Sequence, residues 1–145
     1  MARSKNFFTD KEAIRTIDRF RVIYFMITVL AFIVTEAGRY IYRPFIYKNG
    51  IDDHGIADSI GNSGGIIVQI FLMLAFLNSP PKKVFNVIGF VTIGYIVYEI
   101  LQPYLPKGVF DWNDIYGTLA GGIISIFIWL LINKLVKKNN VIYKF

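Results

Sequence analysis

Residues 66–77 read IIVQIFLMLAFL, an apolar run in which Gln69 is the one polar side chain. A water-soluble helix needs a polar stripe along one face, and this run has none. The uncharged stretch around it extends from residue 59 to residue 81, which matches the roughly 20 residues that a helix needs to cross about 30 Å of hydrocarbon. The run therefore predicts a membrane-spanning helix.

Three further stretches have the same character. They lie at about residues 20–45, 84–102 and 115–133, and charges interrupt the first at Glu36 and the second at Glu99. The 145-residue chain is 54% hydrophobic, above the roughly 45–50% of soluble domains, so disorder and a nucleic-acid-binding module are disfavoured. It has no cysteine, which excludes disulfides, cysteine zinc sites and thiol catalysis. We predict an all-α, integral membrane four-helix bundle on short loops.

The basic residues predict the orientation. All but four of the 16 Lys and Arg residues precede the first span, separate the second from the third, or follow the fourth; the exceptions are Arg39, Arg43, Lys48 and Lys107. By the positive-inside rule, both termini are cytoplasmic. Residues 20–135 form the membrane domain and residues 136–145 a cytoplasmic tail. Residues 1–19 are either an amphipathic helix at the inner surface or a simple extension of the first span.

The four spans look like two copies of one hairpin, residues 20–80 and residues 84–135. An offset of 63 places residues 32–36 on residues 95–99, and an offset of 56 places Asp58 on Asp114 and Asn62 on Thr118. Because each copy crosses the membrane twice, the second copy begins on the same side as the first. We therefore expect two tandem hairpins with the same orientation in the membrane. The second offset also pairs small residues expected to let helices pack closely, namely Gly61 with Gly117 and Gly65 with Gly121.

Acidic and polar side chains gather near the outer ends of the spans. A rise of 1.5 Å per residue places Glu36 and Glu99 about 22–24 Å from the inner boundary, level with Asn62 and Thr118. Carboxylates in hydrocarbon are costly and usually face a partner or a site. The candidate ligand-binding residues are Glu36, Arg39, Asp58, Asn62, Glu99, Gln102, Lys107, Asp114 and Thr118. Their ligand would be a cation or a lipid or glycolipid headgroup; the alternative is that they only join the hairpins.

The second hairpin resembles the VanZ-like family of small bacterial membrane proteins. The resemblance rests on Glu99-Ile-Leu-Gln102, on Pro106-Lys107-Gly108 in the loop, and on Asp114 with Gly121 seven residues later. Gly108 stands at the usual arginine, with Lys107 as a substitute, and Thr118 stands at the usual asparagine. The resemblance implies a cell-envelope role in the bacterial inner membrane, since one member of the family is associated with teicoplanin resistance. It implies no reaction and no cofactor.

Residues 61–65 match the Gly-x-Ser-x-Gly pattern of serine hydrolases. Ser63 would need a base, and the single histidine is His54, in a loop with Asp52 and Asp53 that we interpret as solvated and not as a metal site. Leu119 stands where Ser63 would repeat, so the duplication explains the glycines without catalysis. We expect neither catalytic nor metal-binding residues.

Membrane lipids are the expected partners, together with a second copy or other membrane subunits. An accessory or scaffolding subunit and a proton- or cation-coupled carrier are the alternative functions.

Overall fold

The computed structural model of the chain describes residues 19–77 and 81–142, and these residues are helical or in short connections, with no strand among them. The expected amphipathic helix at residues 1–19 falls outside the described residues, except for Arg19. Four stretches are long and apolar enough to cross a membrane: Phe20–Asn49, Ile56–Leu77, Lys83–Tyr104 and Trp112–Val136. The prediction of an all-α bundle with four candidate membrane spans is confirmed.

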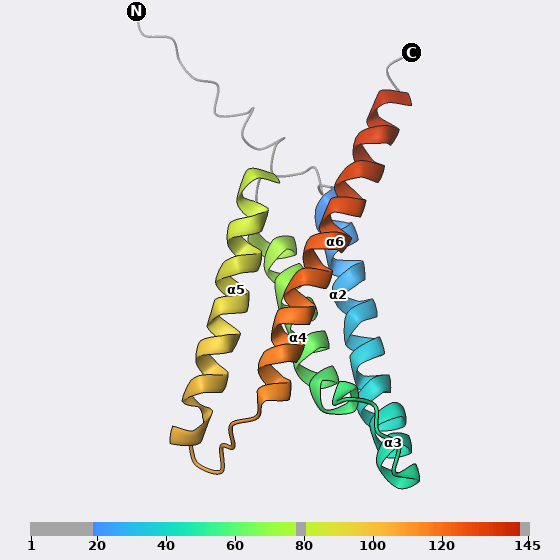
Figure 1. The fold of residues 1–145 in the computed structure, drawn as a ribbon. Helices are drawn as coiled ribbons and strands as arrows, with labels where there is room; N and C mark the ends of the chain where they lie inside the picture. Colours follow the sequence, from blue (N-terminus) through green and yellow to red (C-terminus); the bar gives the residue numbers. More distant parts are fainter. Residues whose placement is uncertain (1–18, 78–80, 143–145) are drawn as a thin grey trace, which may run out of the picture.

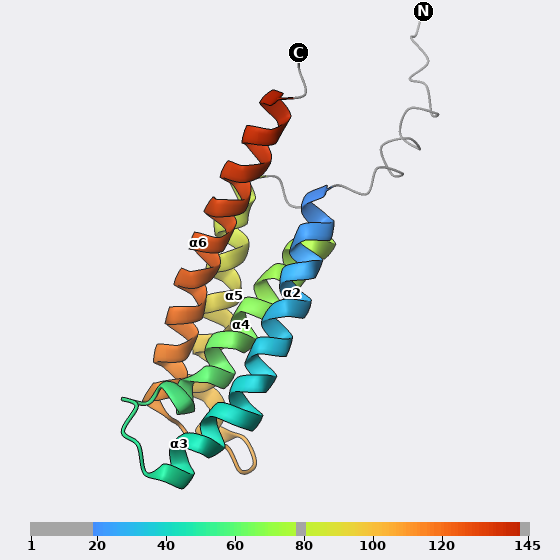
Figure 2. The same cartoon turned by 90° about the vertical axis from the view of Figure 1, so that its right-hand side faces the viewer.

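The chain passes four times along the bundle, alternating in direction (Figure 1). In chain order the elements are α2 (Arg19–Ala37), the π-helix η1 (Gly38–Tyr42), α3 (Arg43–Asn49), α4 (Ile56–Leu77), α5 (Pro81–Leu101), the 3-10 helix η2 (Gln102–Tyr104) and α6 (Trp112–Ile142). The described start of α2 and the end of α6 lie at one end of the bundle, which we call the terminal end (Figures 1 and 2). The connections at residues 50–55 and 105–111 form the opposite, loop end.

Two of the helical stretches extend beyond their expected boundaries. The first continues through η1 and α3 to Asn49, because Pro44 lies in the first turn of α3, where its missing N–H is not needed. The last continues to Ile142, so residues 136–142 prolong α6, and the boundary between membrane domain and tail at residue 135 stays a prediction. No helix-breaking residue occurs between that boundary and Ile142.

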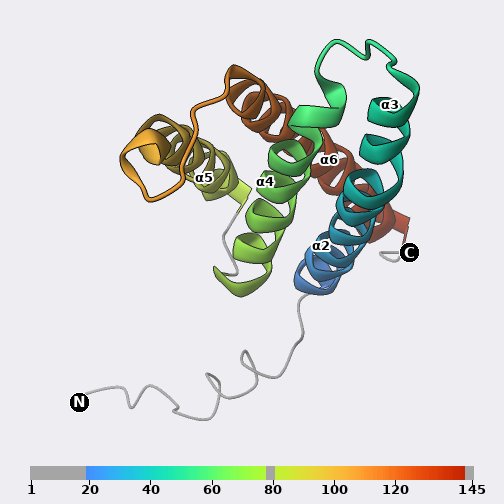
Figure 3. The ribbon, with the colours of Figure 1, turned by 90° about the horizontal axis from the view of Figure 1, so that it is seen from below.

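Helix α4 lies between α2 and α6 and packs extensively against both (Figure 3). Helix α5 packs less extensively, against α4 and α6, whereas α2 and α6 make no contact within the described residues. An exact pseudo-twofold relation between the hairpins would give α2 a contact with α6 to match that of α5 with α4. The tandem repeat therefore stays a prediction.

The apolar core occupies the half of the bundle toward the terminal end. On α4 it contains four fully buried side chains, Ile66, Ile70, Phe71 and Leu74. Tyr24 of α2, Val84 of α5 and Trp129 of α6 belong to the same cluster. This core fixes the helices at one end, and the polar side chains predicted to form a site lie toward the other.

Two of the four predicted glycines sit where α4 and α6 approach each other closely. A Cβ atom at Gly117 would lie 2.5 Å from the carbonyl oxygen of Ser59, and one at Gly121 would overlap the carbonyl oxygen of Ser63. Both contacts are with backbone, which cannot move aside as a flexible side chain would. Gly117 and Gly121 are therefore required for the packing of these two helices.

Gly61 and Gly65 differ from the expectation. A Cβ atom at Gly61 would have Arg39 Cδ as its nearest neighbour, at 4.0 Å, and one at Gly65 would have the Tyr95 hydroxyl, at 3.9 Å. Both positions have room for a methyl group. The close contact on this part of α4 is instead made by Gly64, whose missing Cβ is replaced by the side chain of Thr35 from α2.

Candidate ligand-binding site

Two aspartates cap the starts of α4 and α6 at the loop end. Asp53 Oδ2 accepts a hydrogen bond from the backbone N–H of Ala57 at 2.7 Å, and Asp111 Oδ1 accepts one from that of Asn113 at 2.9 Å. A Cβ atom at Gly55 would lie 2.8 Å from Asn113 Oδ1, so the loop before α4 packs directly on the start of α6. The positive ends of two helix dipoles thus lie side by side, which favours negative charge at this place.

Glu99 is the centre of a buried hydrogen-bond network beside these capped ends. The residue is 3% exposed. Asn62 Nδ2 of α4 donates to Glu99 Oε1 at 3.1 Å. With the Gln102 amide oriented to satisfy both neighbours, its nitrogen donates to Glu99 Oε2 and to the Val109 carbonyl oxygen, each at 2.8 Å. Each carboxylate oxygen therefore has a donor, and the network joins α5 to α4 and to the following loop.

Asp58, in the first turn of α4, forms a second group with two side chains of α3, Arg43 and Tyr47. Arg43 Nη2 donates to Asp58 Oδ1 at 3.2 Å, and the Tyr47 hydroxyl donates to the same oxygen. Arg43 Nε also donates to the Tyr47 hydroxyl at 3.1 Å, and its guanidinium lies 5.3 Å from the centre of that ring. Arg43 therefore neutralises Asp58 and holds α3 against α4.

Asp114, in the first turn of α6, is linked electrostatically to both groups. It interacts with Glu99 of the first group, with Asp58 and Arg43 of the second, and with Asp111. No described residue donates a hydrogen bond to its side chain, which is partly exposed. Glu99, Asp58 and Asp111 thus all interact with Asp114, the acid among these four to which no described residue donates a hydrogen bond. We call Glu99, Asn62, Gln102, Asp114, Asp111, Asp58 and Arg43 the acidic cluster.

The predicted site residues Glu36 and Arg39 form a pair of their own on the first helix. Arg39 Nη1 lies 3.1 Å from Glu36 Oε1, with both side chains partly or largely exposed. Arg39 crosses toward α4 above Gly61. Among the described residues, no hydrogen bond or ion pair joins this pair to Glu99 or to Asp114, so the structure does not make Glu36 a symmetric counterpart of Glu99.

Thr118 and Lys107 also differ from the rest of the predicted set. Thr118 is fully buried, and its hydroxyl has no hydrogen-bond partner within the described residues. Lys107 is exposed in a left-handed backbone conformation (φ 64°) and forms no ion pair with any acid of the described segments. Beside it, a Cβ atom at Gly108 would overlap the Gln102 carbonyl oxygen, so this loop has no room for a side chain at that position.

Ser63 and His54 lie in separate hydrogen-bonding environments. The Ser63 hydroxyl donates to the Ile60 carbonyl oxygen of its own helix at 3.3 Å, whereas His54 Nδ1 lies 3.7 Å from Asp52 Oδ1 in the exposed loop. Of the residues that the structure describes, no three His, Asp or Glu side chains are grouped so as to hold a metal ion.

An aromatic row borders the cluster at the start of α6. The rings of Phe110 and Trp112 meet edge to face at 5.2 Å, and those of Trp112 and Tyr116 stack at 6.3 Å. Trp112, Tyr116 and Tyr104 are exposed. Exposed Trp and Tyr side chains at a helix end are typical of the membrane–water interface.

Comparison of the chain with protein-family models, with curated proteins and with solved structures gave no match.

Four residues of the cluster and its surroundings were not predicted as site residues: Arg43, Tyr47, Asp111 and Asp53. For the two aspartates a signal was present, since each stands just before an apolar helical run, where Asp is a preferred N-cap. For Arg43 and Tyr47 the spacing of four residues places both on one helix face, but the sequence does not indicate which helix that face contacts.

Proposed function

We propose that this chain is a non-enzymatic envelope protein of the bacterial cytoplasmic membrane, similar to the VanZ-like family, that binds a polar headgroup or cell-wall-related ligand at the outer face. The distribution of basic residues supports cytoplasmic termini and an outward-facing loop end. The resemblance of residues 99–121 to the family motif supports the envelope role.

The observation that carries the proposal is the state of Asp114. No side chain or backbone group of the described residues donates to its carboxylate, and it interacts electrostatically with Glu99, whose two oxygens are already occupied by Asn62 and Gln102. With Asp58 held by Arg43, the unsatisfied acceptor capacity of the cluster is concentrated at one partly exposed group. A ligand rich in hydroxyl or ammonium donors fits that chemistry, because charge-assisted hydrogen bonds to a carboxylate are the strong ones.

Teicoplanin tolerance of a bacterial host that expresses the chain tests the proposal. We expect the wild-type chain to raise the minimal inhibitory concentration and Asp114→Asn to return it to that of the empty host, with the same amount of protein in the membrane. Asp52→Asn is the matched control, since that loop aspartate is 84% exposed in its side chain and lies outside the cluster. Wild-type tolerance in the Glu99→Gln, Asp114→Asn double variant would refute the proposal.

A subunit role in a larger membrane complex is the second candidate, because one face of α2 is unpartnered. Within the described residues, α2 packs on α4 and on η1, the π-helix that continues α2. Met26, Leu30 and Ile33 are exposed on α2 at helical spacing. Purification in mild detergent would give a second protein at fixed stoichiometry if this role is right. Recovery of the chain without such a protein would contradict it.

A further inference from the structure

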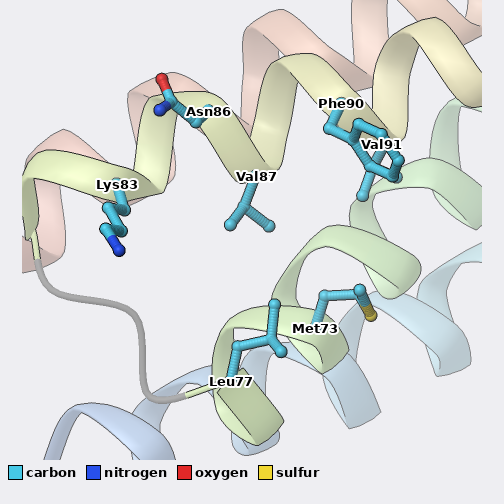
Figure 4. A pocket seen from close by; sticks show the side chains of 7 residues that line it. All are labelled: Met73, Leu77, Lys83, Asn86, Val87, Phe90 and Val91. Atoms are coloured by element: carbon cyan, nitrogen blue, oxygen red, sulfur yellow. The ribbon is translucent and has the colours of Figure 1, made fainter.

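A groove opens between α4 and α5 at the terminal end, on the opposite side of the apolar core from the acidic cluster. It has a volume of about 470 Å³, within the roughly 300–1,000 Å³ of small-ligand sites. Met73 and Leu77 of α4 form one wall, and Val87 and Phe90 of α5 form the other (Figure 4). Phe90 is 78% exposed and Leu77 is 55% exposed, so the groove is open toward the surrounding membrane.

Helices α4 and α5 pack less extensively against each other than α4 and α6 do. The hydrogen bond between Asn62 and Glu99 joins them, and Val84, Ile88 and Val91 of α5 are buried in the apolar core that α4 also lines. Close approach of α4 to α6, by contrast, uses Gly117 and Gly121. Side chains between α4 and α5 therefore face each other across a gap that apolar matter must fill in a membrane.

Lys83 supplies the charge at the rim of the groove. It lies in the first turn of α5, is exposed, and its ammonium group points into the space between the two helices (Figure 4). Within the described residues it forms no ion pair or hydrogen bond. Arg21 of α2 is already engaged, because its Nε donates to the Ala75 carbonyl oxygen at 2.9 Å. Among the described residues, Lys83 is thus a cation without a partner, and it lines the apolar groove.

We propose that this groove binds one acyl chain of an anionic phospholipid, with the lipid phosphate at the Lys83 ammonium group. The apolar walls match a hydrocarbon chain, and the unpaired lysine matches a negative headgroup at the membrane surface. Basic pockets between membrane helices on the cytoplasmic side bind anionic lipid headgroups in this way. The first-turn N–H groups of α5 add to the attraction for an anion. The groove is separate from the acidic cluster, so this site does not depend on the function proposed above.

Lipid retention by the purified full chain tests whether the Lys83 charge selects an anionic headgroup. The chain in mild detergent is offered phosphatidylglycerol or phosphatidylcholine with identical acyl chains, and bound lipid is counted by native mass spectrometry. We expect about fivefold preference for phosphatidylglycerol, the effect of one lysine near the surface. Lys83→Gln should abolish the preference, while Lys134→Gln should keep it. Lys134 is an exposed lysine toward the same end of α6 and does not line the groove.

A substitution that fills the groove tests whether the groove binds an acyl chain. Val87→Trp places a large side chain in the slot and should lower retention of both lipids several-fold, whereas Val97→Trp, on an exposed part of the same helix outside the groove, should not. Equal retention of the two lipids by the wild type overturns the proposal, as does equal loss in the two lysine variants. A dimer that Val87→Trp dissociates, without any lipid preference, would also overturn it and would assign the groove to a second copy.

Discussion

Replacing Asn62 by alanine removes the donor on Glu99 Oε1 and leaves a carboxylate that is 3% exposed with one oxygen unsatisfied. Hydrogen bonds to charged groups contribute about 1.5–3 kcal/mol. Interhelical hydrogen bonds in membranes average about 0.6 kcal/mol, with a maximum near 1.7. The burial of Glu99 puts this bond at the upper end of the membrane range. We therefore expect Asn62→Ala to lower the free energy of unfolding by about 1.5 kcal/mol, roughly tenfold in the equilibrium constant.

A double-mutant cycle isolates the bond from other effects of the substitution. Unfolding by SDS titration in mixed micelles is measured for the wild type, Asn62→Ala, Glu99→Gln and the double variant. We expect a coupling free energy of about 1 kcal/mol or more. The control cycle pairs Asn62→Ala with Glu36→Gln, which should be additive because Glu36 is bound to Arg39 and not to Asn62. A coupling below about 0.3 kcal/mol in the first cycle would refute the assignment of this bond.

Three further predictions concern packing, charge and orientation. Gly117→Ala should destabilise the protein by about 1–3 kcal/mol because its Cβ would meet the Ser59 carbonyl oxygen, whereas Gly61→Ala should not; equal effects in SDS unfolding would contradict this packing. Arg43→Gln should cost less than about 1 kcal/mol, and less still at high salt, since its side chain is 44% exposed; a larger, salt-independent loss would count against this. The chain has no cysteine, so Lys107→Cys and Lys134→Cys give single labels. In intact cells an impermeant maleimide should label the first and not the second, and the reverse pattern would invert the proposed orientation.

The four helices and the common level of Asn62 and Glu99 followed from the sequence because both depend on position along the helix axis. Uncharged runs of sufficient length gave the four helices, and a rise of 1.5 Å per residue put Asn62 level with Glu99, which it contacts. In the structure, the pairs of Glu36 with Arg39 and of Glu99 with Gln102 also have the three-residue spacing of neighbours on one helix face.

What the sequence missed depends on rotation about the helix axis. Gly64 packs closely where Gly65 was expected to, a difference of one residue and therefore of about 100° around the helix. Arg43 reaches Asp58 after the π-helical segment Gly38–Tyr42, whose wider turn changes which residues share a face. The sequence carries no pattern that locates such a turn, and depth alone did not show that Asn62 would bond to Glu99.

Helix α6 is longer than the membrane is thick. At 1.5 Å per residue, its 31 residues span about 46 Å, against about 30 Å of hydrocarbon. A rod of that length that pivots at the glycine contacts with α4, which lie in its first third, converts a tilt at the Asp114 end into an opposite and larger displacement at the other end. A probe attached to the last turn of α6 would thus report events at Asp114 from across the bilayer, without touching the site.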